Sequence, residues 1–178
     1  MNKVEKTVTS AMFLALGFIL PFLTGQIQQI GNMFLPMHIP VFLCSFICGW
    51  EYASVIGLIL PILRSAIFTM PVMYPNAISM SLELLAYGFF ASFIYDRIKM
   101  RNMRGLYFAL ITAMLAGRIV WGVSQAVLLG LGDNVFGFTA FVSGAFLNAI
   151  PGIIIQLAFI PAIVVSIQKT KLFRKDEK

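Results

Sequence analysis

Charged residues are scarce in this chain. Only 11% of its 178 residues are charged, whereas 60% are hydrophobic. A water-soluble domain carries about 25% charged residues, so this composition excludes an ordinary soluble protein and indicates an integral membrane protein. The length fits one membrane domain over residues 1–178 and leaves no room for a second, soluble module.

Residue types that serve catalysis and metal binding are equally few. The chain has one histidine, His38, and two cysteines, Cys44 and Cys48, which we interpret as buried thiols because they are too few for a zinc site. It contains no Gly-x-x-x-x-Gly-Lys-Ser/Thr phosphate loop, no His-Glu-x-x-His helix and no Gly-x-Ser-x-Gly elbow. We therefore predict a protein that is not an enzyme, with no catalytic residue, metal or cofactor. An intramembrane enzyme that depends on His38 is the least supported alternative.

All but two of the 13 basic residues lie in three short tracts. The tracts are the N-terminus (Lys3 and Lys6), a central loop (Arg97, Lys99, Arg101 and Arg104) and the C-terminus (Lys169, Lys171, Arg174, Lys175 and Lys178). Basic residues that flank membrane helices stay in the cytoplasm. All three tracts should therefore face cytoplasmic lipid headgroups, not nucleic acid, and an even number of crossings must separate each tract from the next.

The apolar stretches between these tracts predict an all-α protein with six transmembrane helices. The helices cover about residues 7–23, 39–49, 52–68, 76–95, 105–130 and 141–167, and most approach the length of about 20 residues that crosses a bilayer. Four precede the central tract and two follow it, so the N- and C-termini are both predicted to be cytoplasmic. We expect an uncharged loop over 24–37, a proline-rich loop over 69–75, and turns at Trp50-Glu51 and Gly132-Asp133-Asn134.

Three charged residues lie inside the predicted helices: Arg64, Glu83 and Arg118. An ionisable side chain at membrane depth normally faces a cavity or a partner. A rise of about 1.5 Å per residue places Glu83 and Arg118 at similar depth in the outer half of the membrane, with Arg64 about one turn higher.

Polar residues recur at helical spacing around these groups. They are Asn76, Ser79 or Met80, Glu83 and Tyr87 on the fourth helix, Arg118, Trp121 and Gln125 on the fifth, and Asn148, Gly152 and Gln156 on the sixth. Three such stripes in the outer half of the membrane predict a binding cavity open to the outside. The predicted substrate-binding residues are His38, Arg64, Tyr74, Asn76, Glu83, Tyr87, Arg118, Trp121, Gln125, Asn148 and Gln156.

Plainer interpretations stand beside this one. Glu83 and Arg118 can form a buried ion pair that only holds helices together, and Arg64 can extend outward to the lipid headgroups. His38, beside two prolines at a loop boundary, is more typical of a hydrogen-bonding anchor than of a base. Small residues four apart, at Ala11 and Ala15, Ala53 and Gly57, and Ala113 and Gly117, predict faces where helices approach closely.

The chain resembles the substrate-binding S components of energy-coupling factor (ECF) vitamin transporters over essentially its whole length. The resemblance rests on six predicted helices, on Ala11-x-x-x-Ala15, and on Leu35-Pro36-Met37-His38-Ile39-Pro40-Val41, Arg64, Glu83 with Tyr87-Gly88, Gly117-Arg118 and Asn148-x-x-Pro151-Gly152-x-x-x-Gln156. It implies a protein of a prokaryotic cell membrane that binds a vitamin or vitamin precursor from outside, beneath a lid formed here by residues 26–37.

The resemblance also implies partners. Ala11 and Ala15 would contact a transmembrane T component that couples to two cytoplasmic ATPases, and ATP-driven rotation within the membrane would release the substrate inside. The vitamin stays open: Arg118 suits an anion such as pantothenate, Glu83 suits an amine such as a B6 vitamer, and a cobalamin is a third option. If Glu83 and Arg118 neutralise each other, neither of the first two preferences follows. The alternative class is a membrane scaffold or assembly protein whose polar stripes bind only its own helices.

Overall fold

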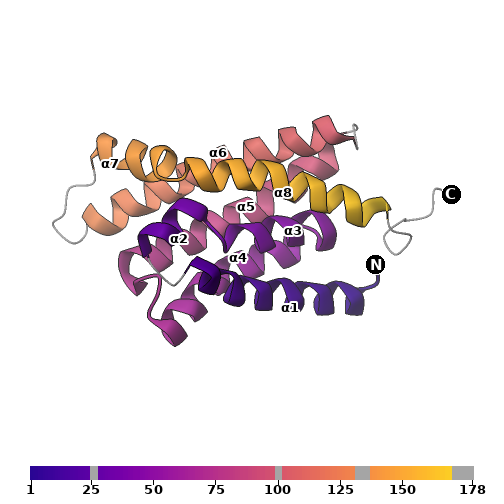
Figure 1. The fold of residues 1–178 in the computed structure, drawn as a ribbon, viewed down its shortest axis with the longest axis horizontal. Coiled ribbons are helices and arrows are strands. Elements are labelled where there is room, and N and C mark those ends of the chain that lie inside the picture. The colour runs from indigo at the N-terminus through magenta and orange to yellow at the C-terminus, as the bar shows by residue number, and fades with distance from the viewer. Residues whose placement is uncertain (25–27, 99–101, 131–136, 170–178) are drawn as a thin grey trace.

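The computed structural model describes residues 1–24, 28–98, 102–130 and 137–169, and every regular element in these ranges is helical. The elements are α1 (Lys3–Ile19), η1 (Leu20–Thr24), α2 (Gln28–Phe34), α3 (His38–Cys48), α4 (Trp50–Phe68), η2 (Met73–Ala77), α5 (Ile78–Arg97), α6 (Met103–Gly130), α7 (Phe138–Val142), η3 (Ser143–Leu147) and α8 (Ile150–Lys169). Figure 1 shows them as one elongated bundle, with α1 along one side and α8 along the other. The all-α prediction is therefore confirmed for the described residues.

Five segments are long and apolar enough to cross a membrane, and a sixth is shorter. The five are Lys3–Leu23, Trp50–Phe68, Met73–Arg97, Met103–Gly130 and Ser143–Ile167, and the shorter one is His38–Cys48. They match the six predicted helices in order and lie within a few residues of the predicted bounds. The second helix, predicted to be short, is indeed the short one.

The ends of the helices that carry basic tracts lie together. In Figure 1 the start of α1, the end of α5, the start of α6 and the end of α8 occupy one end of the bundle, whereas α2 and α7 lie at the opposite end. An even number of passes therefore separates the tracts, as the sequence predicts. Part of the central and C-terminal tracts, including Lys99, Arg101 and residues 170–178, lies outside the described residues.

Three local predictions need correction. The turn between α3 and α4 is Gly49, whose φ of 102° suits glycine, and the predicted turn residues Trp50 and Glu51 form the first turn of α4. The predicted loop over 24–37 contains the helix α2. The predicted single helix over 141–167 is interrupted at Asn148, between η3 and α8. The predicted turn at Gly132-Asp133-Asn134 lies outside the described residues.

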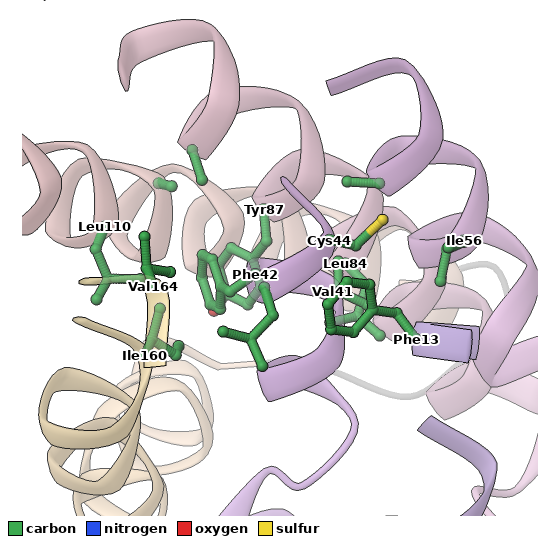
Figure 2. Close-up of a cluster of buried hydrophobic side chains, with 14 of the residues drawn as sticks. Phe13, Val41, Phe42, Cys44, Ile56, Leu84, Tyr87, Leu110, Ile160 and Val164 are labelled. Atoms are coloured by element: carbon green, nitrogen blue, oxygen red, sulfur yellow. The ribbon is translucent and has the colours of Figure 1, made fainter. Parts of the chain in front are cut away.

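A buried apolar core joins α3, α4, α5, α6 and α8, with Phe13 of α1 also part of it (Figure 2). Within this core the ring of Tyr87 stacks on Phe42, with ring centroids 4.8 Å apart. Cys44 and Cys48 are both buried and free, as predicted. This core lies between the basic end of the bundle and the polar residues of α5 and α6.

Small residues let α4 and α5 approach closely. A Cβ placed on Gly57 would lie 2.4 Å from the carbonyl oxygen of Leu84, and one on Gly88 would lie 2.6 Å from the backbone of Ala53. Either contact would force the helices apart, which confirms the predicted close-approach face of Ala53 and Gly57. The same spacing at Ala11 and Ala15 of α1 has a different outcome, because both residues are exposed.

Candidate functional site

A partly open hollow lies between the non-basic ends of α5 and α6. It has a volume of about 90 Å³, several times the roughly 10–15 Å³ that one water molecule requires. Its wall is formed by Leu35, Pro71, Asn76, Met80, Glu83, Arg118, Trp121, Gly144 and Asn148. Five of the predicted substrate-binding residues therefore meet in one place: Asn76, Glu83, Arg118, Trp121 and Asn148.

Glu83 is the centre of the polar cluster in this wall. Its Oε1 accepts a hydrogen bond from the Tyr87 hydroxyl at 2.8 Å and lies 3.0 Å from Nη1 of Arg118. The spacing of four residues places Glu83 and Tyr87 on one face of α5. Gly117 of α6 makes room for the Tyr87 ring, since a Cβ there would lie 2.1 Å from a ring carbon. A small residue thus brings the carboxylate, the hydroxyl and the guanidinium together.

Arg118 is only 5% exposed, yet its guanidinium forms part of the wall of the hollow. The Nη1 group pairs with Glu83, whereas the Nε–H group is buried and has no hydrogen-bond partner among the described residues. A guanidinium carries five N–H donors, so the ion pair with Glu83 leaves some donors of Arg118 unused. The two side chains are therefore bound to each other and still border a void.

His38 lies behind the carboxylate and is 1% exposed. It begins α3, and its Nε2 is 3.7 Å from Oε2 of Glu83, too far for a hydrogen bond. Neither ring nitrogen has a hydrogen-bond partner among the described residues. The histidine predicted to anchor a loop instead packs inside the bundle, against Glu83 and the ring of Tyr87.

Asn76 and Gln125 continue the polar wall toward the open end. Gln125 Nε2 donates to Oδ1 of Asn76 at 3.1 Å, which fixes the orientation of the amide that borders the hollow. Ser79 donates to the carbonyl oxygens of Pro75 and Asn76, each at 3.0 Å. These bonds stabilise the irregular backbone of η2, which contains the non-helical residue Tyr74.

Three other predicted site residues lie away from the wall. Arg64 is buried at the other side of α4, where its Nη1 donates to the carbonyl oxygen of Phe18 at 2.6 Å. Tyr74 is 47% exposed, and its hydroxyl donates to the carbonyl of Leu128. Gln156 of α8 is 1% exposed, with its Nε2 unpartnered among the described residues.

Four wall residues were not among the predicted substrate-binding residues. Met80 is one of two alternatives, with Ser79, in the polar stripe predicted on the fourth helix. Leu35 and Pro71 come from segments predicted to be loops, where helical spacing gives no information. Gly144 allows the Trp121 ring to approach, because a Cβ on Gly144 would lie 2.8 Å from that ring. The sequence does not reveal this contact, because Gly144 and Trp121 belong to different helices. Their proximity becomes visible only when those helices are seen to pack together.

The lid predicted over residues 26–37 is described from residue 28 onward. Its helix α2 packs on α8, where a Cβ placed on Gly152 would lie 2.7 Å from the carbonyl oxygen of Met33. Leu35, which follows α2, reaches the wall of the hollow. This segment therefore covers one side of the site and depends on a glycine for its close contact with α8.

One comparison with known proteins gives a match. The family model described as "ECF transporter, substrate-specific component" matches residues 5–167. No curated protein and no solved structure matches the chain significantly.

Proposed function

Because this chain belongs to the family of ECF transporter substrate-specific components, we propose that it captures a water-soluble vitamin or vitamin precursor outside the cell for ATP-driven import. The family makes it a membrane transport subunit and not an enzyme. The hollow beside Glu83 and Arg118 is the proposed substrate site. The single observation that carries this proposal is that an ion pair, two amides and an indole ring border a void instead of being packed against one another.

The orientation follows from charge. The ends of α1, α5, α6 and α8 that adjoin the basic tracts share one end of the bundle, and basic flanks favour the cytoplasm. This supports the proposal that both termini lie inside a prokaryotic cell and that the hollow opens toward the outside. Residues 26–37 are then the lid over the bound substrate.

The partners are proposed to be a T component and two ATPase subunits. Ala11 and Ala15 are exposed on α1, beside the exposed side chains of Met12 and Leu16, which are 62% and 43% accessible. Small residues within an apolar surface permit a second helix to approach closely in lipid. This supports α1 as the surface that contacts the T component.

The size of the hollow favours a small substrate. Sites for drug-sized ligands usually measure about 300–1,000 Å³, whereas this hollow measures about 90 Å³. A compound with one ring requires a modest displacement of Leu35 and the lid. A cobalamin would require the α2 segment and α8 to separate, which makes it the least favoured of the vitamins considered.

Binding of a vitamin panel tests the proposal. The protein purified in detergent is titrated with B-type vitamins by calorimetry, and any small molecule that co-purifies is identified by mass spectrometry. We expect one vitamin to bind tightly, and Asn148→Ala and Trp121→Ala to weaken that binding. Absence of binding across the panel, with no co-purifying compound, would reject the proposal.

The membrane scaffold remains the second candidate. The observation that favours it is the direct contact between Glu83 and Arg118, since a purely structural ion pair needs no ligand. It predicts that substitutions at Trp121 and Asn148 change no small-molecule binding. It also predicts that the protein's role is to assemble with other membrane proteins, which would co-purify with it.

A further inference from the structure

The charged groups in the wall of the hollow cancel. Glu83 and Arg118 are the only charged residues that border it among the described residues, and their side chains are 3.0 Å apart with 1% and 6% exposure. The Tyr87 hydroxyl, which is uncharged, donates a hydrogen bond to Oε1 of Glu83. His38 is not one of the residues that border the hollow, and its Nε2 lies 3.7 Å from Oε2 of Glu83, too far for a hydrogen bond.

From this balance we infer that the substrate carries no net charge when bound. A charged substrate would be left without a counter-charge beside an ion pair whose own side chains are buried, and burying an unpaired charge is costly. It could obtain a counter-charge only by separating Glu83 from Arg118, which would leave the other member of that pair unpaired. This inference rests on the proposed function, because it concerns the substrate of the same hollow.

The remaining wall indicates the chemistry of an uncharged substrate. The guanidinium of Arg118 borders the hollow and has donors beyond the Nη1 group that pairs with Glu83, which suits a carbonyl oxygen, a hydroxyl oxygen or a ring nitrogen. The amides of Asn76 and Asn148 offer both donors and acceptors, and Trp121 offers a flat apolar surface. The substrate class is therefore a small, uncharged ring compound or amide with at least one hydrogen-bond acceptor.

Matched pairs of compounds that differ in charge test the inference. Calorimetric titration compares pantothenate with pantothenol, nicotinate with nicotinamide, and biotin with its primary amide. In the pair that binds, we expect the uncharged member to bind about tenfold more tightly or better, because the charged member lacks a counter-charge. Equal affinity, or tighter binding of the charged member, would overturn the inference and leave the proposed function intact. If no member of these pairs and no vitamin of the wider panel binds, the proposed function itself fails, and the inference with it.

Substitution of Glu83 provides a second, independent test. Glu83→Gln leaves Arg118 without its carboxylate, so the preference within the responding pair should reverse toward the anion. The double variant Glu83→Gln/Arg118→Gln restores zero charge and should again prefer the uncharged member. Glu51→Gln removes one exposed carboxylate from the first turn of α4 and should change nothing. An unchanged preference in folded Glu83→Gln would overturn the inference; if that variant does not fold, the wild-type pairs decide.

Discussion

The two arginines inside the bundle have contrasting surroundings. Arg118 pairs with the carboxylate of Glu83 and borders a hollow. Arg64 donates to the backbone carbonyl of Phe18 and lies 5.1 Å from the ring centroids of both Phe22 and Phe68. One guanidinium is therefore neutralised by an opposite charge, and the other is held by dipoles and aromatic faces.

This contrast separates two tasks for the same side chain. The carbonyl of Phe18 belongs to the last turn of α1, where carbonyl oxygens lack partners within the helix and a cation is favourable. Arg64 thus fastens the end of α1 to α4. Arg118 instead borders a void and carries more N–H donors than its ion pair with Glu83 uses, which suits the proposed substrate site.

The largest effect should come from removing the positive charge of the ion pair. Arg118→Met leaves Glu83 buried without a counter-charge, and we expect a loss of about 3–5 kcal/mol in the free energy of unfolding. Thermal unfolding of the purified protein in detergent measures the effect. The double variant Glu83→Gln/Arg118→Met should recover much of the loss; a double variant as unstable as the single one would contradict this account.

The equivalent change at the other arginine should cost less. Arg64→Met removes one charge-assisted hydrogen bond and leaves no carboxylate unpaired, so we expect a loss of about 1.5–3 kcal/mol. The same unfolding measurement applies, with ligand affinity measured alongside. Unchanged affinity would assign Arg64 to the attachment of α1, whereas a loss of affinity without a loss of stability would return it to the substrate site.

A third test disturbs only the cover over the Arg118 region. Gly152→Ala places a methyl group 2.7 Å from the carbonyl of Met33, and overpacking of this kind costs about 1–3 kcal/mol. Because α2 must shift, we expect weaker ligand binding, with little change in the hydrogen bond between Arg64 and Phe18. Gly130→Ala, where a Cβ would meet no atom within 4 Å, is the matched control, and calorimetry of the two variants provides the comparison.

The smallest effect on binding should come from the exposed face of α1. Ala11→Trp or Ala15→Trp touches neither arginine, so ligand affinity and stability should remain those of the wild type. Uptake of the vitamin by cells that express the complete transporter should nevertheless be lost, because the bulky ring blocks a close helix contact. Weakened binding together with normal uptake would contradict the assignment of this face.

Sequence reasoning placed Glu83 and Arg118 at similar depth for a physical reason, with an ion pair between them as one of two interpretations. Depth along a helix follows from a constant rise per residue, so Glu83 and Arg118 could be placed at one level before any packing was known. The number and order of the helices followed from the lengths of the apolar stretches. The even number of crossings between basic tracts followed from the positions of the basic residues.

The surroundings of Arg64 could not be predicted in this way. Its acceptor is a backbone carbonyl, which every residue possesses and no sequence pattern marks. The rotation of α4 about its own axis decides whether Arg64 faces α1 or the hollow, and that rotation depends on contacts between segments distant in the sequence. Leu35 and Pro71 escaped prediction for a related reason, since both belong to irregular segments without a helical repeat.

The stacked rings of Tyr87 and Phe42 also bear on how a solute leaves the protein. Beneath Glu83 these rings, together with Leu84 and Leu110, are at most 1% accessible, so the described helices provide no conduit from the hollow to the basic end. A molecule in the hollow, above these buried side chains, can therefore leave only through the opening by which it entered. If the hollow holds the substrate, as we propose, its delivery to the basic end would require the whole subunit to turn or the helices to separate, and the resting subunit would not leak.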